Sequence, residues 1–330
     1  MGSYSVSVII PVYNAERYIA RCVQSLLEQT LDNIEFIFVD DCSTDNTLYL
    51  LNEYVAAYKH RSAHIQVICH DVNKGSATAR NAGLLHATGE YIGWVDSDDW
   101  VEPEMFEMLY KAAEKEDMDL VWSDFYFTSS SMESQKTQLV EEKRESFLQA
   151  LIEGTIQGML WNKIAKRSLF IDYGIRFPDG CNMAEDRNVC IKLACFSQKI
   201  KHLPKALYHY TQYNPLSLTR DLSTLRVYEE INNTHDVLHF FALHHIEGLS
   251  VCMLNDYKFR TKKKLLFSSD INDLLLWANV FPESNDWLYS SKDLFFRHKL
   301  IAWLSVHCSK RVLKLYLVVK KMRQKRIIKK

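Results

Sequence analysis

The chain has 330 residues, of which 47% are hydrophobic and 25% charged, a composition typical of a globular protein. Its net charge is −1 at pH 7, but residues 310–330 hold ten Lys or Arg and no acid. No stretch reaches the ~18 apolar residues of a membrane span. The eight cysteines form no CxxC pair and no signal peptide precedes the first strand, so we expect reduced thiols, no zinc site and a cytoplasmic protein. No nucleic-acid partner is expected.

Strand and helix patterns alternate through the first half of the chain. Buried strands are predicted at residues 6–10, 35–39, 65–69, 91–95 and 119–123. Helices are predicted at residues 15–29, from 44 to about 55, 76–87 and 103–115, with Pro11 ending the first strand, Ser43 or Thr44 capping the second helix and Gly89 ending the third. Four strand–helix alternations indicate an α/β fold with a doubly wound, mostly parallel sheet and helices on both faces.

The pattern changes in the second half. Residues 128–146 are polar and rich in turn formers, which predicts a loop or hinge. Beyond about residue 225 the pattern is helical only, so a helical C-terminal region is expected.

Polar side chains follow each of the first four predicted strands. Because the carboxyl ends of parallel strands share one edge of a sheet, these clusters should converge on one ligand site. The clusters are Pro11, Tyr13 and Asn14; Asp40, Asp41, Ser43 and Asp45; Asp71, Asn73, Lys74 and Arg80; and Asp96, Asp98 and Asp99.

Three of these clusters suit a nucleotide. A carboxylate at Asp40 or Asp41 can accept a hydrogen bond from an imide N–H such as that of uracil, and Tyr13 can offer its ring to a base. Arg80 and Lys74 can meet a phosphate. No G-x-G-x-x-G follows the first strand and no P-loop motif occurs, so dinucleotide dehydrogenases and P-loop enzymes are disfavoured.

The fourth cluster places three acids in four residues, and these repel one another unless a positive group lies between them. A divalent cation is one solution, since hard cations prefer oxygen ligands. Asp96 and Asp98 alternate by two and would point the same way, one toward ribose and one toward a metal that bridges a diphosphate. The alternative is a solvated acidic turn ahead of a helix that starts near Pro103.

Four ordered motifs carry a family resemblance. They are Val8-Ile-Ile-Pro-Val-Tyr-Asn14, Val39-Asp-Asp-Cys-Ser-Thr-Asp45, Asn73-Lys-Gly-Ser-Ala-Thr-Ala-Arg-Asn-Ala-Gly83 and Val95-Asp-Ser-Asp-Asp-Trp100. Residues 6 to about 105 thereby resemble family 2 inverting glycosyltransferases of the GT-A fold. The resemblance implies a nucleotide-sugar donor, usually a UDP-sugar, and a Mg²⁺ or Mn²⁺ ion. One departure is Cys42, where the family often has Gly.

Carried onto this sequence, the resemblance implies two sets of donor-site residues. The nucleotide-sugar ligands would be Pro11, Tyr13, Asn14, Asp40, Asp41, Asn73, Arg80 and Asp96. The metal ligands would be Asp98 first, then Asp96, with Asp99 and His209 as further candidates. A histidine beside aromatic residues is more often a satisfied core residue, which is the alternative for His209. Ser217 and Arg220 would belong to a loop that covers the donor.

The general base is sought in Met183-Ala-Glu-Asp-Arg187. Similar proteins carry a Glu–Asp pair here whose second residue deprotonates the acceptor hydroxyl, which implies Asp186, oriented by Glu185. The alternative is a helix N-terminus enriched in acids. On the acceptor side, Trp161 could stack on a sugar ring or lie in the core, and Lys163 belongs to the same resembling segment.

The C-terminal segment places apolar residues at helical spacing. They are Leu304, Cys308, Val312, Leu315, Val319 and Met322, flanked by Lys and Arg. Residues 300–330 would then form a basic amphipathic helix on an anionic membrane surface, or a helix packed on the domain with a solvated basic end.

The sequence therefore predicts a GT-A catalytic domain at 1–224, with a donor-binding half at 1–125 and an acceptor half at 147–224, and a helical C-terminal region at 225–330 with a basic amphipathic tail. The predicted function is metal-dependent inverting transfer of a hexosyl or N-acetylhexosaminyl group to a glycan or lipid-linked acceptor in cell-surface polysaccharide synthesis. The enzyme would be cytoplasmic or peripheral on the inner face of the plasma membrane. Alternatives are a sugar-nucleotide pyrophosphorylase and a catalytically silent nucleotide-sugar-binding scaffold.

Overall fold

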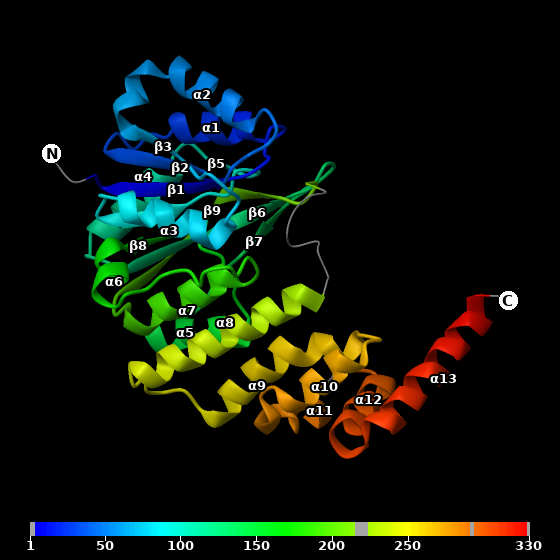
Figure 1. Cartoon of the computed structure of the whole chain (residues 1–330). Coiled ribbons are helices and arrows are strands. Elements are labelled where there is room, and N and C mark those ends of the chain that lie inside the picture. Colours follow the sequence, from blue (N-terminus) through cyan, green and yellow to red (C-terminus); the bar gives the residue numbers. More distant parts are fainter. Residues whose placement is uncertain (1–3, 215–223, 291–293, 329–330) are drawn as a thin grey trace. The chain divides into compact units, whose positions relative to one another are not determined.

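The computed structural model describes residues 4–214, 224–290 and 294–328 (Figure 1). The chain forms two compact units, one of residues 1–220 with 236–246 and the other of residues 221–235 with 247–330. The domain bounds expected at residues 1–224 and 225–330, and the predicted halves of the catalytic domain, stay predictions.

One sheet organises the first unit. Among the described residues it contains β1 (Val6–Val12), β2 (Ile34–Asp40), β3 (Ile65–Cys69), β4 (Tyr91–Trp94), β5 (Trp100–Val101), β6 (Leu120–Thr128), β7 (Glu133–Lys136), β8 (Lys163–Lys166) and β9 (Ile200–Thr211). The strand order is β3-β2-β1-β4-β8-β6-β9-β5, with β7 paired to β6. Strands β1 to β4 are parallel, as are β6 and β9, whereas β5, β7 and β8 run antiparallel to their neighbours. The prediction of a mostly parallel α/β sheet is confirmed.

Helices cover both faces of this sheet (Figure 1). They are α1 (Ile19–Leu27), α2 (Thr47–Ala57), α3 (Ser76–His86), α4 (Met105–Glu114), α5 (Arg144–Glu153), α6 (Arg167–Asp172) and α7 (Glu185–Phe196), with a short 3₁₀ turn η1 (Lys59–His64). Successive side chains of β1 point to opposite faces of the sheet, so both faces need a cover of helices. Val8 and Ile10 join the core cluster that contains α1 and α4, whereas Ile9 meets α3 so closely that a Cβ on Gly83 would lie 2.3 Å from Ile9 Cγ2.

Two predicted strand and loop boundaries are wrong. Strand β1 continues through Pro11 to Val12. Strand β4 ends opposite Ile9, so Pro11 has a strand neighbour only on the β2 side. Proline lacks a backbone N–H, and on its other side there is no strand that would need this donor. Residues 128–146 are not a plain loop, since β6 extends to Thr128 and turns back as β7, and α5 begins at Arg144.

Two predicted helix ends are also wrong. No side chain caps the Asn46 end of α2 in the way expected of Ser43 or Thr44. Instead, the Asp45 carboxylate accepts a hydrogen bond from the Thr47 backbone N–H at 3.0 Å. Gly89 does not adopt a left-handed helix-ending conformation. It is needed for close approach to β1, since a Cβ there would lie 2.5 Å from the Ser7 backbone nitrogen.

The second unit is helical wherever the structure describes it, as predicted. Its elements are the first part of α8 (Thr224–Leu243), α9 (Val251–Lys262), η3 (Lys263–Phe267), α10 (Ile271–Asn279), η4 (Pro282–Ser284), α11 (Trp287–Ser290), α12 (Phe296–His307) and α13 (Lys310–Ile328). Leu274, Ile301, Leu313 and Leu317 form a small core. In the described part of the chain, none of these helices is long and apolar enough to cross a membrane.

The single apolar stripe expected from Leu304 to Met322 is corrected by this arrangement. The chain leaves helical geometry at Cys308, with φ −114° and ψ 155°, so the segment forms two helices. Leu304 packs against the small core, whereas Val312 and Leu315 are exposed. The side chain of Met322 lies outside those that the structure describes.

Candidate active site

The loops after β1 and β2 are tied together at one edge of the sheet. Asn14 has a left-handed backbone with φ 45°. Its side-chain oxygen accepts a hydrogen bond from the Thr44 backbone N–H at 2.8 Å, and its own N–H donates to Ser43 Oγ at 3.1 Å. Two of the predicted polar clusters therefore lie together.

Asp41 organises the loop after β3. Its buried carboxylate accepts hydrogen bonds from the backbone N–H groups of Lys74 at 2.9 Å and Gly75 at 2.6 Å. The Nδ1 atom of His70 lies 2.7 Å from the same carboxylate. Gly75 has φ 87° and precedes the first residue of α3, so Asp41 fixes the start of that helix and has its acceptor positions taken up by the protein.

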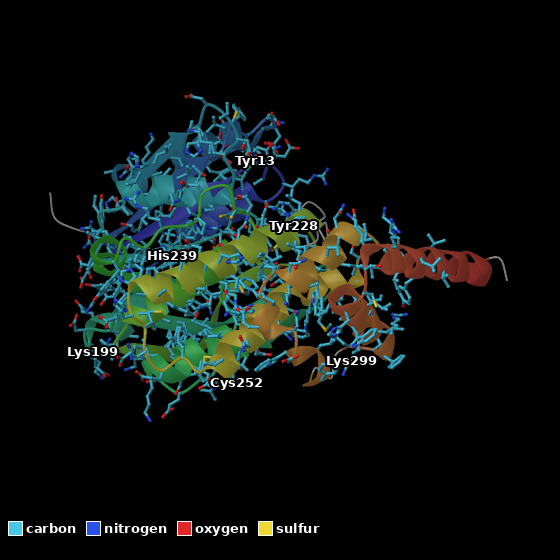
Figure 2. The ribbon with its side chains drawn as sticks, turned by 60° about the horizontal axis from the view of Figure 1, so that its bottom comes forward. Tyr13, Lys199, Tyr228, His239, Cys252 and Lys299 are labelled. Atoms are coloured by element: carbon cyan, nitrogen blue, oxygen red, sulfur yellow. The ribbon has the colours of Figure 1, made fainter. Side chains whose placement is uncertain are left out.

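Asp40 keeps an acceptor for a ligand. One of its oxygens accepts a hydrogen bond from the Ser43 backbone N–H at 3.1 Å, while Oδ1 is buried without a hydrogen-bond partner. Buried polar atoms without partners are rare, so this oxygen suits a donor from a bound base better than Asp41 does. Tyr13 is exposed near this edge (Figure 2), and Asn73 is exposed in the loop after β3.

Arg80 joins three carboxylates inside the protein. Its Nη2 lies 2.8 Å from Asp96 Oδ1, its Nη1 2.7 Å from Glu185 Oε1 and 3.4 Å from Asp186 Oδ1. We expected Arg80 to meet a phosphate. The structure instead uses its buried side chain to connect the end of β4 to the start of α7.

The start of α7 is held in place by a neighbouring loop and helix. Ala184 precedes the helix in a left-handed conformation with φ 64°. The Ser76 hydroxyl at the first turn of α3 lies 3.0 Å from Glu185 Oε1 and 3.2 Å from Asn182 Oδ1. Through Arg80, the predicted catalytic pair is linked to the donor-side carboxylate Asp96.

Burial raises the pKa of Asp186 to about 7, with the neighbouring charges of Glu185 and Asp96 adding to the increase and that of Arg80 opposing it. Its Oδ1 is buried without a hydrogen-bond partner. A carboxyl group with a pKa near neutral can accept a proton during a reaction and release it afterwards.

The three acids of the run 96–99 have different surroundings. Asp99 is buried, and its two oxygens accept hydrogen bonds from the Tyr208 hydroxyl at 2.6 Å and the Thr211 N–H at 2.7 Å. These contacts anchor the run to β9, so Asp99 has a structural role in this arrangement and is not offered to a metal. Asp98 is half-buried and accepts a hydrogen bond from the Asn214 amide at 2.7 Å.

Asp96 and Asp98 are the two acids of the run that remain candidates for holding a divalent cation. Burial raises the pKa of Asp98 to about 6, and the negative charge of Asp96 adds to the increase. A cation held by both carboxylates would relieve this second, repulsive contribution. In residues 4–214, 224–290 and 294–328, no three His, Cys, Asp or Glu side chains gather closely enough to hold a metal ion by themselves. Other oxygen ligands, such as those of a diphosphate, would have to complete the coordination.

His209 has its contacts within the protein. Its ring stacks between Trp100, with centroids 3.3 Å apart, and Tyr126, at 4.7 Å. Its Nε2 lies 2.8 Å from a Glu102 carboxylate oxygen and its Nδ1 2.7 Å from one of Glu133. Both ring nitrogens are occupied, so in this arrangement His209 does not offer a ligand to the metal that the resemblance implied.

Trp161 and Lys163 lie in the core, which is the alternative that the sequence left open for Trp161. Trp161 is buried and stacks on Tyr208, with ring centroids 4.2 Å apart, so its face is not available to a sugar. Lys163 is also buried, and its ammonium donates to the Met159 carbonyl oxygen at 2.6 Å and to Asn162 Oδ1 at 2.7 Å. Ser217 and Arg220 lie outside the described residues.

The sequence interpretation missed Tyr208 and Asn214. The Tyr208 hydroxyl contacts Asp99 and also accepts a hydrogen bond from the Asp96 backbone N–H at 3.1 Å. No local signal marks either residue, because both meet the acidic run only through the pairing of β9 with β5.

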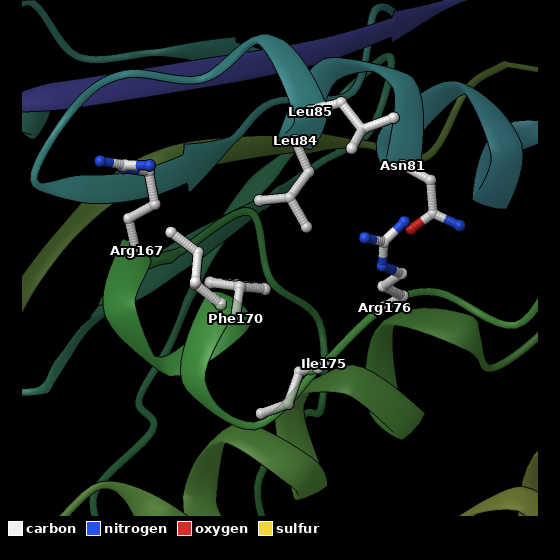
Figure 3. A pocket seen from close by; sticks show the side chains of 9 residues that line it. Asn81, Leu84, Leu85, Arg167, Phe170, Ile175 and Arg176 are labelled. Carbon is white, nitrogen blue, oxygen red and sulfur yellow. The ribbon is translucent and has the colours of Figure 1, made fainter.

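A small pocket lies between α3 and α6 (Figure 3). Its volume is about 180 Å³. It is lined by Asn81, Leu84, Leu85, Arg167, Phe170, Ile171, Gly174, Ile175 and Arg176. None of these residues belongs to the carboxylate cluster. Asn81 follows Arg80 in α3 and donates to the Phe177 carbonyl oxygen at 2.9 Å, which ties the pocket to the segment that leads to α7.

Comparison with solved structures defines the class of fold. The structure of residues 1–349 of S. aureus TarS in complex with UDP-GlcNAc has a TM-score of 0.69 and 19% identity, covering 94% of this chain and 91% of that one. Mannosyltransferase PcManGT from Pyrobaculum calidifontis, solved with GDP-Man and Mn²⁺, has a TM-score of 0.51 and 18% identity, covering 98% and 87%. The fold is that of the GT-A glycosyltransferases.

Sequence comparison identifies the family. The sequence model "Glycosyl transferase family 2" matches residues 7–192. The chain is 32% identical over 307 residues to the putative glycosyltransferase EpsH of Bacillus subtilis, covering 86% of each chain. It is 27% identical over 250 residues to the cholesterol galactosyltransferase of Borreliella burgdorferi, covering 71% of this chain and 67% of that one. The chain belongs to glycosyltransferase family 2 and is a glycosyltransferase.

Proposed function

We propose that this glycosyltransferase is metal-dependent and inverting, and that it moves a hexosyl or N-acetylhexosaminyl group from a UDP-sugar to a hydroxyl of a glycan or lipid-linked acceptor in cell-surface polysaccharide synthesis. The observation that carries the proposal is the buried Arg80, which joins the predicted base Asp186 to the donor-side acid Asp96. The UDP-GlcNAc bound to the TarS structure supports the choice of donor.

Donor binding would use the edge formed by β1, β2 and β4. The buried Oδ1 of Asp40 lacks a hydrogen-bond partner and would accept the imide N–H of uracil, with the exposed ring of Tyr13 against the base. Asp96 and Asp98 would hold Mg²⁺ or Mn²⁺. When bound, that ion would neutralise the diphosphate as the leaving group departs. Pro11, Asn14 and Asn73 stay predicted donor-site residues.

Asp186 would act as the general base. It would take the proton of the acceptor hydroxyl while the oxygen attacks the anomeric carbon from the side opposite the diphosphate, which inverts the configuration. Base assistance of this kind contributes roughly 10²–10⁴-fold to a rate. Glu185 would orient the group through its contacts with Arg80 and Ser76, and Arg80 would moderate the pKa of Asp186.

The place of action would be the cytoplasm or the inner face of the plasma membrane, where UDP-sugars and lipid-linked acceptors meet. In this scheme residues 1–125 would bind the donor and residues 147–224 the acceptor, although Trp161 and Lys163 are buried and other side chains would have to contact the acceptor.

The proposal is tested by incubating the full chain with a panel of UDP-, GDP- and dTDP-sugars, with Mn²⁺ or EDTA, and measuring nucleotide release with and without candidate acceptors. We expect Mn²⁺-dependent release from a UDP-sugar, retained donor binding without transfer in Asp186→Asn, and loss of metal-dependent binding in Asp98→Asn. Pyrophosphate-dependent formation of UTP would favour a pyrophosphorylase. Donor binding with no release from any donor–acceptor pair would favour a silent scaffold.

A further inference from the structure

Helix α12 exposes large apolar side chains on one of its sides. Phe296, Leu300 and Trp303 recur at spacings of four and three residues, which places them on one helical face. Phe296 is 81% exposed and Trp303 45%, and Phe295, immediately before the helix, is also exposed. The opposite side of α12 carries Ile301, which packs into the small core of the second unit.

Helix α13 repeats this arrangement. Leu313 and Leu317 are buried in the same small core. Val312, Leu315, Val318 and Val319 point elsewhere and are exposed, Leu315 by 66%. Single exposed apolar residues are ordinary on a protein surface, whereas each of these two helices exposes several large apolar side chains, which is typical of an interaction surface.

Positive charge surrounds these apolar residues. Residues 294–330 contain twelve Lys or Arg and no Asp or Glu. Arg297 and Lys299 lie on either side of the apolar face in the helical repeat of α12, and Figure 2 labels Lys299. Lys310, Arg311 and Lys314 are exposed on the first turns of α13. The partner must therefore offer both negative charge and an apolar phase.

We propose that α12 and α13 bind the surface of an anionic lipid bilayer. Their aromatic and aliphatic side chains would enter the boundary between headgroups and acyl chains, and their Lys and Arg would contact lipid phosphates. We define the surface by Phe295, Phe296, Leu300, Trp303, Val312, Leu315, Val318 and Val319 with the five basic residues named above. This inference concerns the partner of the second unit and does not depend on the chemistry of the carboxylate site.

A second copy of the chain fits this surface less well. Most homodimers are symmetric, so the same patch would meet itself, and the basic residues of the two copies would repel each other. An acidic protein partner would satisfy the charge, but it need not offer an apolar phase to side chains spread over two helices.

The test uses the full chain and large vesicles of phosphatidylcholine alone or with 30 mol% phosphatidylglycerol, in a sedimentation assay at several salt concentrations. We expect binding only to the anionic vesicles, weakening as salt rises. At a free-energy contribution near 1 kcal/mol per basic residue, the triple variant Lys310→Gln/Arg311→Gln/Lys314→Gln should bind roughly 10²-fold more weakly.

A matched pair of double variants tests whether vesicle binding depends on this surface or on exposed apolar side chains in general. Phe296→Ser/Trp303→Ser should lose binding to anionic vesicles. Tyr49→Ser/Leu85→Ser, which alters two apolar side chains of the first unit that are 63% and 68% exposed, should bind like the wild type. The emission of Trp303 is the difference between the fluorescence of the wild type and that of Trp303→Phe, and brominated lipid should quench it. The substitution by Phe keeps an aromatic side chain at this position, so the fold should stay intact.

Three results would overturn the inference. The first is equal affinity for neutral and anionic vesicles. The second is no lipid quenching of the Trp303 signal while the protein sediments with vesicles. The third is self-association of the wild type at micromolar concentration that Phe296→Ser/Trp303→Ser abolishes, because the surface would then be an interface between copies.

Discussion

Replacing Arg80 tests the charge network of the candidate site. The Arg80 guanidinium lies 3.4 Å from Asp186 Oδ1 and within 2.8 Å of carboxylate oxygens of Asp96 and Glu185. The pKa of Asp186, about 7 mainly because of burial, already includes the opposing effect of Arg80. In Arg80→Gln the Asp186 carboxylate loses that partner and keeps two carboxylate neighbours, so its pKa must rise.

The size of the effect follows from the proximity of the charges. An opposite charge at this range moves a carboxyl pKa by about 1–3 units, so the pKa of Asp186 in the variant would be roughly 8–10. At pH 7 the deprotonated fraction would fall from about a half to roughly 10⁻¹–10⁻³, and a rate that needs the carboxylate falls in proportion. Activity requires the deprotonated form of Asp186, so activity is lost as the pH falls through the pKa of Asp186. Because that pKa is higher in Arg80→Gln, the variant loses its activity at a higher pH than the wild type.

The assay is the pH dependence of kcat/KM between pH 5.5 and 10, measured by nucleotide release with a saturating acceptor. The wild type should show an acid limb that reports the protonation of Asp186. Arg80→Gln should shift this limb upward and regain activity above pH 9. Arg61→Gln is the matched control, because Arg61 is another buried arginine of the first unit, bound to the backbone oxygens of Leu31 and Gln29. It should lower stability and leave the profile in place.

An acid limb at the same pH in Arg80→Gln and the wild type would refute the reasoning, since Asp186 would then titrate independently of Arg80. Loss of the fold is a separate outcome, because removing one partner of a buried ion pair costs about 3–5 kcal/mol. Arg80→Lys retains the positive charge. It should move the limb less than Arg80→Gln if the effect is electrostatic.

Three further changes test other parts of the site. Asp98→Asn should abolish Mn²⁺-dependent UDP binding in calorimetry, and wild-type binding should weaken below pH 6, because the carboxylate with a pKa of about 6 becomes protonated there. Tyr208→Phe should cost about 1–3 kcal/mol in urea unfolding, because Asp99 loses its 2.6 Å hydrogen bond; an unchanged midpoint would contradict this. Gly75→Ala should lower kcat, because its Cβ would lie 2.3 Å from Asn182 Oδ1. Gly180→Ala is the comparison, because Gly180 also has a positive φ of 72° but open space around it, so its effect should be milder.

The strands and the shared edge of the sheet could be predicted from local sequence. Buried strands such as β2 and β4 consist of apolar runs with short polar connections, and parallel strands place those connections at the same edge. The position of Asp96 followed from the acidic run after a predicted strand, whereas the role of Asp186 was implied by the family resemblance and stays a prediction. These features depend on short segments, which is why the sequence specifies them.

Roles that depend on distant pairings could not be predicted. Asp40 and Asp41 are adjacent and chemically equal in the sequence, and only the loop around Gly75 decides that Asp41 binds backbone N–H groups. Trp161 is of a residue type that can stack on sugars, but the pairing of β6 with β9 brings Phe125 and Tyr208 against it in the core. The pairing of β9 with β5 gives Asp99 its anchor.

The buried arginine raises the question of what its position achieves. Burying one guanidinium with three carboxylates is a poor way to gain stability, because desolvation offsets much of the attraction. The cluster of Arg80, Asp96, Glu185 and Asp186 also retains an excess of negative charge. What the arrangement provides is a rigid link between the donor-side carboxylate at the end of β4 and the base at the start of α7. Any ligand that changes the charge at Asp96 must then also change the pKa of Asp186, so donor binding would prepare the base for the acceptor.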